Sequence, residues 1–340
     1  MLPTLRKLIC GCDFVGFDME FTGLHSALLP GGQHSLYDYP GKWYQKARRS
    51  VQQFTVCQLG LSIFSSENSN KYMAHSYNFF LFPATFGQMD SEFSFQAFSI
   101  KFLAHYGFDF NKVAALVSPI SANKVQKNAK VRKEHHEEIL LQILVRVALV
   151  IGKGFQMFEI QLVLRKALQD IWTVPLGNQE PLVGHNMLMD LLHLHDKFYN
   201  PLPEDYEEFK KNIHILFPIV IDTKNVAKAI WKECEFPHAS NLLEVFELLC
   251  SDLNPTNASC PEVFHASDCL RYATKKFPHE AAYDAFLCGS VLLKTAHLLL
   301  CRISCDPART SSSFSQYLDV LAPYVNQVNL IRARIQKIVS

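Results

Sequence analysis

Residues 13–24, with the sequence DFVGFDMEFTGL, decide both the fold and the chemistry of this chain. The run is mostly apolar or aromatic and ends at Thr22-Gly23, which indicates a buried strand. Side chains two residues apart on a strand point to the same face, so Asp18 and Glu20 should lie side by side. Two buried carboxylates repel each other and cost desolvation energy unless a cation compensates them. The strand therefore predicts a metal site.

A second acid follows the sequence PLVGHNMLMD at residues 181–190. A short apolar strand, a break at Gly184 and a helical spacing of apolar residues from Met187 onward indicate a strand followed by a helix. This arrangement places Asp190 in the first turns of the helix. The alternative for Asp190 is a solvated helix face.

The third segment is PHEAAYDAF at residues 278–286. Pro278 is expected at the first position of a helix, because proline is favoured there. Asp284 would then lie between one and two turns into the helix, and His279 at its mouth. An imidazole at that place could reach a water molecule that metal ions activate.

Together these segments supply the residue types that phosphodiester hydrolysis needs. Two Mg²⁺ or Mn²⁺ ions about 3.5–4 Å apart stabilise both the attacking hydroxide and the leaving 3′ oxygen. Such hard cations take oxygen ligands, and a histidine with a pKa near neutrality is a natural general base. Four carboxylates and one histidine in three separated segments can build this site.

The order and context of these motifs resemble the DEDD exonuclease superfamily in its DEDDh form. Residues 12–111 and 154–335 are similar to the poly(A)-specific ribonuclease family, including the branch that trims the 3′ ends of piRNAs. The stretches that carry the resemblance are DFVGFDMEFTGL, VQQFTVCQLGLSIF, YNFFLFP, PLVGHNMLMDLLHL, VIDTKNVAK and PHEAAYDAFLCGSVLL.

The expected architecture is an α/β protein of the ribonuclease H-like (DEDD exonuclease) type, a mixed sheet covered by helices. Strands are expected near residues 13–21, 54–64, 72–82, 181–184 and 218–222. By resemblance, residues 1–111 and 154–340 form the exoribonuclease domain. Residues 112–153 are expected to be a shortened helical insertion at the position of the family's inserted RNA-binding domain.

The resemblance also implies residue roles. Asp18, Glu20, Asp190 and Asp284 would hold two Mg²⁺ ions, for which Mn²⁺ can substitute, and His279 would be the general base. The implied substrate contacts are Phe21, Thr22, Gly23, Leu24 and Asn186. The implied activity is 3′ to 5′ trimming of single-stranded RNA ends, either piRNA precursors or poly(A) tails, with release of 5′ mononucleotides.

Two alternatives share the same acids. Relatives have a longer segment before the PLVGHN strand, and its loss could misplace Asp190; a shift of about 1 Å can cost about 10²-fold in rate. A catalytically impaired chain that binds RNA or a partner through the same cleft is the first alternative. A DNA exonuclease is the second, although it shares the site but not the surrounding motifs.

Composition restricts how RNA could be held. The chain has 340 residues, is 49% hydrophobic and carries a net charge of +1, so it has ample core but no overall attraction for polyanions. Residues 42–49, KWYQKARR, interleave cations with aromatics, which predicts either an RNA contact or an exposed helix face with a buried Trp43. Residues 124–133 hold five cations but precede three glutamates, which favours a solvated helix.

Cysteine and histidine spacings do not indicate zinc or disulfides. The ten cysteines lack paired C-x-x-C motifs, and His135-His136, His193 and His195 are expected to face solvent or fill polar contacts. With no signal peptide, we expect a cytoplasmic chain with reduced thiols.

Two apolar stretches are the candidates for membrane spans. Residues 139–151 and 287–303 are apolar but too short or interrupted by charge, so they predict buried or amphipathic helices rather than membrane spans. Related trimmers carry a C-terminal anchor to the endoplasmic reticulum or mitochondrial surface, and we expect this chain to lack it. The resemblance also implies a small-RNA-carrying protein partner and a homodimer.

Overall fold

The computed structural model describes residues 2–24, 38–68, 70–81, 93–111, 180–233, 237–306, 308–309, 312–329 and 336–337. Several expectations lie outside these residues: the insertion at 112–153, the basic run at 124–133, His135-His136 and the apolar stretch at 139–151. The proposed domain boundaries stay predictions.

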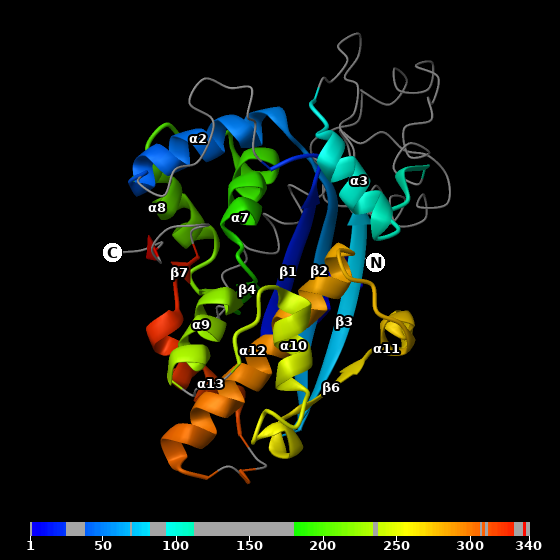
Figure 1. Ribbon diagram of the computed structural model, residues 1–340, viewed down its shortest axis with the longest axis vertical. Helices are drawn as coiled ribbons and strands as arrows, with labels where there is room; N and C mark the ends of the chain where they lie inside the picture. The colour runs from blue at the N-terminus through cyan, green and yellow to red at the C-terminus, as the bar shows by residue number, and fades with distance from the viewer. Residues whose placement is uncertain are drawn as a thin grey trace, which may run out of the picture.

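Among the described residues, eight strands form one mixed sheet in the order β6-β3-β2-β1-β4-β5-β7-β8 (Figure 1). Strands β1, β2 and β3 form an antiparallel meander, whereas β4, β5 and β7 continue from β1 in parallel. Strand β6 pairs with β3 in parallel, and β8 pairs with β7 antiparallel. The strands are β1 Phe14–Phe21, β2 Val56–Asn68, β3 Lys71–Phe80, β4 Leu182–Gly184, β5 Val220–Asp222, β6 Glu262–His265, β7 Gln327–Val328 and β8 Gln336–Lys337.

Helices cover both faces of this sheet. One apolar core packs alternate residues of β1, such as Phe17 and Met19, against α1, α2, α7 and α8. The other core packs Phe14 against α9, α10, α12 and α13. The helices are α1 Leu2–Ile9, α2 Pro40–Gln53, α3 Ala97–His105, α7 Leu188–Leu194, α8 Tyr206–Leu216, α9 Thr223–Glu233, α10 Leu242–Leu249, α11 Arg271–Thr274, α12 Ala281–Ser304 and α13 Phe314–Leu321. The predicted mixed sheet covered by helices is confirmed.

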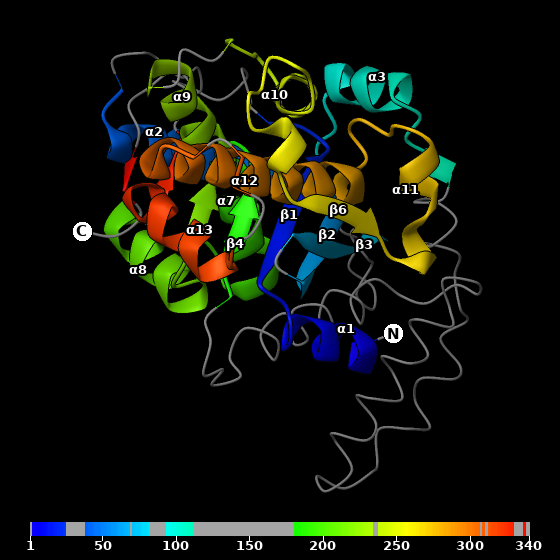
Figure 2. The ribbon, with the colours of Figure 1, turned by 90° about the horizontal axis from the view of Figure 1, so that it is seen from below.

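Helix α12 lies across the strands of the sheet (Figure 2), and two glycines of the sheet let it pack closely. A Cβ atom on Gly16 of β1 would lie 2.2 Å from the carbonyl oxygen of Ala285. A Cβ atom on Gly60 of β2 would lie 2.0 Å from the carbonyl carbon of Ala281. Only glycine allows this approach, which brings the acid of α12 over the acids of β1.

The composition of α12 would also suit a membrane span, because the helix has 24 residues and contains an 18-residue window with a mean hydropathy of 1.5. Most of that apolar window, 83%, is buried inside the protein. The helix is therefore the central core helix, as predicted for residues 287–303.

The start of α12 corrects one expectation. Pro278 is not the first helical residue, because the helix begins at Ala281 after an extended Glu280. The main-chain N–H of Ala281 donates a 2.8 Å hydrogen bond to Oε1 of Gln58, which satisfies one free donor of the helix start. His279 has a left-handed φ of 62°, so the chain turns sharply before the helix.

Candidate active site

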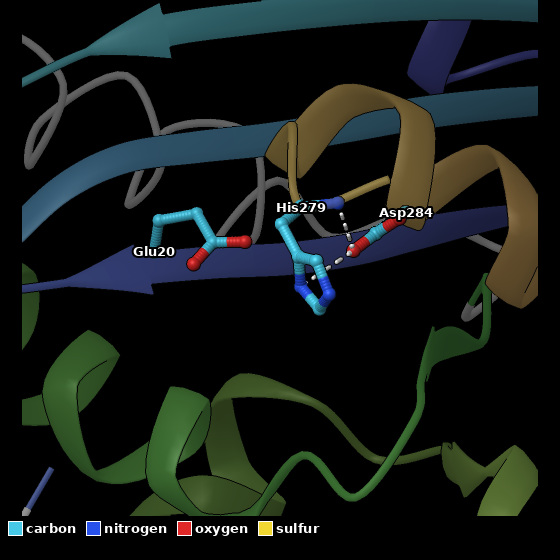
Figure 3. A group of neighbouring side chains, drawn as sticks. All are labelled: Glu20, His279 and Asp284. Atoms are coloured by element: carbon cyan, nitrogen blue, oxygen red, sulfur yellow. Dashed lines mark hydrogen bonds and ion pairs between the residues drawn. The ribbon is translucent and has the colours of Figure 1, made fainter. Parts of the chain in front are cut away.

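The acids predicted from three segments meet at one end of β1. Asp18 and Glu20 occupy alternate positions of β1 on the face that α12 covers. Ligand atoms of Glu20, His279 and Asp284 all lie within 4.8 Å of one another (Figure 3). Asp18 is close enough for the charges of Glu20, Asp190 and Asp284 to raise its pKa. The structure thus brings together all five residues, and their individual roles stay predictions.

Asp190 reaches this cluster because β4 is short. Strand β4 pairs only with Val15 and Gly16 of β1, so the edge of β1 is open farther along. There the main-chain N–H of Met19 donates a 3.0 Å hydrogen bond to Oδ1 of Asp190. Asp190 is 7% exposed, which contradicts the alternative of a solvated helix face.

His279 is held from two sides. Its main-chain N–H donates a 3.1 Å hydrogen bond to Oδ2 of Asp284, and its Nδ1 lies 3.9 Å from the same oxygen (Figure 3). From α3 and the residue after it, the rings of Phe102 and Tyr106 lie 4.5 and 4.2 Å from the imidazole. These contacts fix the imidazole beside the carboxylates.

The pKa values of the four carboxyl groups are raised. Burial is the largest cause that raises the pKa of Asp18 and Glu20 well above the usual range, followed by the charges of Asp190 and Asp284. Burial likewise raises the pKa of Asp190 to about 8 and that of Asp284 to about 7. Among the described residues, no cationic side chain appears among the causes of these shifts. The cluster therefore favours a bound positive charge.

The donor set fits a hard divalent cation. Four carboxylates offer oxygen ligands, and buried carboxylates without a cationic partner are costly unless an ion or a proton neutralises them. No cysteine thiol belongs to the group of ligand atoms within 4.8 Å in the described chain. Asp18, Glu20, Asp190 and Asp284 are thus the residues that could hold Mg²⁺ or Mn²⁺.

Thr22 and Gly23, which were predicted to contact substrate, make contacts within the protein at the end of β1. The hydroxyl of Thr22 accepts from the N–H of Thr55 and donates to the carbonyl of Ser94 at 2.8 Å, and Thr22 is fully buried. Gly23 is also buried, and a Cβ there would lie 2.6 Å from the ring of Phe54. Both residues fix the chain that leaves β1; as nucleotide contacts they stay predictions.

Phe21 and Leu24 flank that turn. The ring of Phe21 stacks on His193 with centroids 4.2 Å apart, and Leu24 is 40% exposed beside the cluster-bearing strand. Both also stay predictions as substrate contacts.

His193 and His195 are fully buried, and a ring nitrogen of each bonds to a main-chain oxygen. The prediction that they face solvent is therefore wrong, and the alternative that they fill polar contacts is confirmed.

Asn186 lies beside the carboxylate of Asp222, which was not among the predicted site residues. Its φ is 59°, its N–H donates a 2.7 Å hydrogen bond to Oδ1 of Asp222, and its Oδ1 accepts from Nδ2 of Asn329. Asp222 is fully buried at the end of β5, and its charge raises the pKa of Asp190. The signal was present in VIDTKNVAK, where an acid ends an apolar strand.

A cavity of about 300 Å³ borders His279 on the side of β3. Gln58, Tyr106 and Arg271 are among its lining residues. Gln58 lies opposite Glu20 in the β1–β2 register and also binds the start of α12. The imidazole therefore borders space that solvent can occupy.

The basic stretch at residues 42–49 lies on α2 and does not offer stacking aromatics. Trp43 and Tyr44 are 2% and 0% exposed. Lys46 pairs with Asp38 at 2.6 Å. This burial contradicts the RNA-stacking interpretation and supports the alternative of a helix face with a buried tryptophan.

Comparison with known proteins agrees with this geometry. The profile of the CAF1 family ribonucleases matches residues 1–292. The chain belongs to the CAF1 family of ribonucleases. The predicted family resemblance and the prediction of a ribonuclease are thereby confirmed.

Within the CAF1 family, the chain is similar to the poly(A)-specific ribonuclease PNLDC1 of mouse and of human. It is 50% identical to each, and the matches cover 99% and 98% of this chain and 77% and 78% of those proteins. The pre-piRNA 3′-exonuclease trimmer of Bombyx mori is 26% identical, with 97% of this chain and 75% of the trimmer covered. The mouse alignment spans 408 positions, so PNLDC1 contains segments that this 340-residue chain lacks.

Solved CAF1-type structures share the fold. The Mg²⁺- and Mn²⁺-bound form of S. pombe Pop2p has a TM-score of 0.54 at 18% identity, covering 96% of this chain and 93% of that one. The RNase domain of yeast Pop2 has a TM-score of 0.50 at 15% identity, covering 88% and 82%. The ribonuclease H-like fold class is confirmed.

Proposed function

We propose that this CAF1-family chain is a 3′ to 5′ exoribonuclease that uses two divalent metal ions and releases 5′ mononucleotides. The observation that carries the proposal is the convergence of four carboxylates from β1, α7 and α12, of which Asp190 is buried and the other three are partly buried. Burial raises the pKa of all four, and neighbouring carboxylate charges add to the shift for Asp18, Glu20 and Asp190. The Mg²⁺- and Mn²⁺-bound form of the structurally similar Pop2p supports the choice of metal.

Asp18, Glu20, Asp190 and Asp284 hold the ions in this proposal. When bound, two such ions supply positive charge for the attacking and leaving oxygens of an in-line displacement. The protein's own part is orientation. The hydrogen bond from Met19 fixes Asp190. The close packing of α12 on β1 and β2 fixes Asp284.

His279 accepts the proton of the attacking water. Burial lowers the pKa of its imidazole, so a ring nitrogen keeps its lone pair at neutral pH. The hydrogen bond to Asp284 and the rings of Phe102 and Tyr106 hold the imidazole beside the acids. A base must be close to the proton that it removes, and this placement supports that role.

The substrate in this proposal is the single-stranded 3′ end of an RNA, either a piRNA precursor or a poly(A) tail. The names of PNLDC1 and of the Bombyx mori trimmer support this choice. A small-RNA-carrying protein partner and a homodimer stay predictions. Preference for RNA over DNA would require contacts to the 2′-hydroxyl group, so a competition between RNA and DNA of one sequence tests it.

The test is a shortening assay on the full chain with 5′-labelled and 3′-labelled RNA. With Mg²⁺ we expect a ladder that shortens by one nucleotide at a time and labelled 5′ mononucleotide from the 3′-labelled RNA; EDTA should abolish both. Asp18→Asn should remove activity, whereas Asp319→Asn, an exposed acid on α13, should not. RNA binding without metal-dependent shortening would support the catalytically impaired alternative instead.

A further inference from the structure

The segment after α13 returns to the turn that delivers Asp190. Strand β7 pairs with β5, and Asn329 follows β7 directly. The main-chain N–H of Asn329 donates a 2.9 Å hydrogen bond to Oδ2 of Asp222. Its side-chain Nδ2 donates a 2.6 Å hydrogen bond to Oδ1 of Asn186. One residue thus bonds both to Asn186 in the turn and to Asp222 at the end of β5.

The turn itself depends on these contacts. It joins β4, which ends at Gly184, to α7, which begins at Leu188. Asn186 adopts a φ of 59° inside the turn and donates its N–H to Oδ1 of Asp222 at 2.7 Å. The two oxygens of Asp222 therefore link the turn to Asn329. Asp222 and Asn329 are 0% and 5% exposed, so water does not readily replace these bonds.

Asp190 lies near the start of α7, so the turn that precedes the helix bears directly on its position. Helix α7 has seven residues before it continues into a π-helix over His195–Tyr199, and Asp190 is the third of the seven. A change in the direction of the turn would move Asp190 relative to β1. The amide of Asn329 cannot rotate freely, because Nζ of Lys228 donates to its Oδ1 and keeps Nδ2 directed at Asn186.

We propose that Asn329 is a positioning residue that sets the place of Asp190 through Asn186 and Asp222. This inference rests on the proposed function, because it takes Asp190 as a metal-holding acid. Asn329 lies beyond residue 292, where the match to the CAF1 family ends. The active site is then completed by a C-terminal segment that the family profile does not include.

Loss of any buried hydrogen bond near β7 could lower stability, so the test of Asn329 needs a matched control variant. Asn225, which also bonds to this segment, provides that control. Nδ2 of Asn225 donates a 2.8 Å hydrogen bond to the carbonyl of Gln327 in β7. Asn225 is 2% exposed, and its side chain anchors β7; among the described residues, it makes no hydrogen bond to the turn at residues 185–187. Asn225→Ala and Asn329→Ala should therefore cost similar stability, whereas only Asn329→Ala should disturb Asp190.

The experiment compares both variants with the wild-type full chain. We expect Asn329→Ala to lower kcat by about tenfold to hundredfold with KM within about twofold, because a shift of about 1 Å can cost 10²-fold. Without RNA, a thermal-shift titration with Mn²⁺ should show a higher half-saturating concentration for Asn329→Ala than for Asn225→Ala. Equal effects of both variants on kcat and on Mn²⁺ titration would overturn the proposal.

Asn329→Asp is the second variant, and it tests the hydrogen bond to Asn186 with a smaller change in side-chain shape than Asn329→Ala. It keeps the side-chain shape, and Asn186 can rotate its amide to donate to the new carboxylate. The added charge lies near Asp222, and Nζ of Lys228, which already donates to Oδ1 of Asn329, can pair with it. We expect the kcat of Asn329→Asp to be at least about tenfold higher than that of a strongly impaired Asn329→Ala. A kcat as low as that of Asn329→Ala would contradict the assignment of Asn329 as a positioning residue. If wild type does not shorten RNA, the proposed function fails, while the Mn²⁺ titration still decides whether Asn329 positions Asp190.

Discussion

The main-chain N–H of Met19 donates a hydrogen bond to a side-chain oxygen of Asp190, 171 residues later in the chain. In most sheets such a donor would pair with a neighbouring strand. Here β4 has already ended, and the carboxylate takes the place of that strand. One interaction therefore closes the edge of β1 and brings α7 to the acids of β1.

Asp190→Asn should separate stability from activity. The asparagine oxygen can still accept from Met19, so the fold is kept, while a carboxyl group whose charged form is disfavoured by burial becomes a neutral amide. In EDTA we expect the free energy of unfolding to rise by ~0.5–2 kcal/mol. RNA shortening should fall by at least ~100-fold, since even residues behind metal ligands contribute 10–100-fold. Urea unfolding and the shortening assay measure the two effects; a destabilised variant would contradict the argument that burial of the Asp190 carboxyl costs stability.

The same acids predict how stability depends on pH without metal. The pKa of Asp190 is about 8 in the folded chain, against an ordinary value of 3.8, so between these values the folded state binds more protons. The contribution of Asp190 to the free energy of unfolding should therefore fall as pH rises, by at most ~1.4 kcal/mol per unit.

Buried histidines act in the opposite direction in that pH range. Burial lowers the pKa of His193 to about 3, so its contribution to stability falls as pH drops below its ordinary value. The informative quantity is thus the difference between wild type and Asp190→Asn in EDTA. Urea unfolding from pH 5 to 8 should show wild type losing stability relative to the variant; a constant difference would show that Asp190 keeps an ordinary pKa.

The sequence predicted the strand and the acids because both depend on local patterns. Alternation along β1 placed Asp18 and Glu20 on one face, and the structure has them on the face that α12 covers. The proline rule failed at Pro278, because a long-range bond from Ala281 to Gln58 decides where α12 begins. Local propensity does not include a partner on another strand.

The supporting residues of the site could not be predicted in the same way. Asp222 and Asn329 are connected to the site through hydrogen bonds to Asn186, whose φ is left-handed, and through each other. No spacing in the sequence links positions so far apart. Similarly, the aromatics at residues 42–49 look like base-stacking groups until tertiary packing buries them.

Gly60→Ala should damage the fold and the site together. The new Cβ would lie 2.0 Å from the carbonyl carbon of Ala281, which is backbone, so α12 must move away from the sheet. We expect a loss of ~1–3 kcal/mol in the free energy of unfolding. Because α12 carries Asp284, kcat should also fall, by up to ~10²-fold for a shift of about 1 Å.

Gly11→Ala is the matched control for that substitution. A Cβ on Gly11 would meet its nearest atom, the carbonyl oxygen of Lys7, at 3.6 Å, an ordinary contact. Thermal unfolding and kcat of Gly11→Ala should stay close to wild type. If Gly60→Ala were as stable and as active as Gly11→Ala, the close approach of α12 would not matter for the site.

His279→Asn tests whether the imidazole is a base or a metal ligand. Asparagine tolerates the left-handed φ of 62° at this position, so the substitution removes the imidazole with little backbone strain. As a general base, His279 should contribute ~10²–10⁴-fold to kcat, while the Mn²⁺-induced thermal shift stays unchanged because all four carboxylates remain. His238→Asn, an exposed histidine, is the control and should keep full activity. Loss of the Mn²⁺ shift together with kcat would instead make His279 a ligand, since its ring nitrogen lies within 4.8 Å of ligand atoms of Glu20 and Asp284.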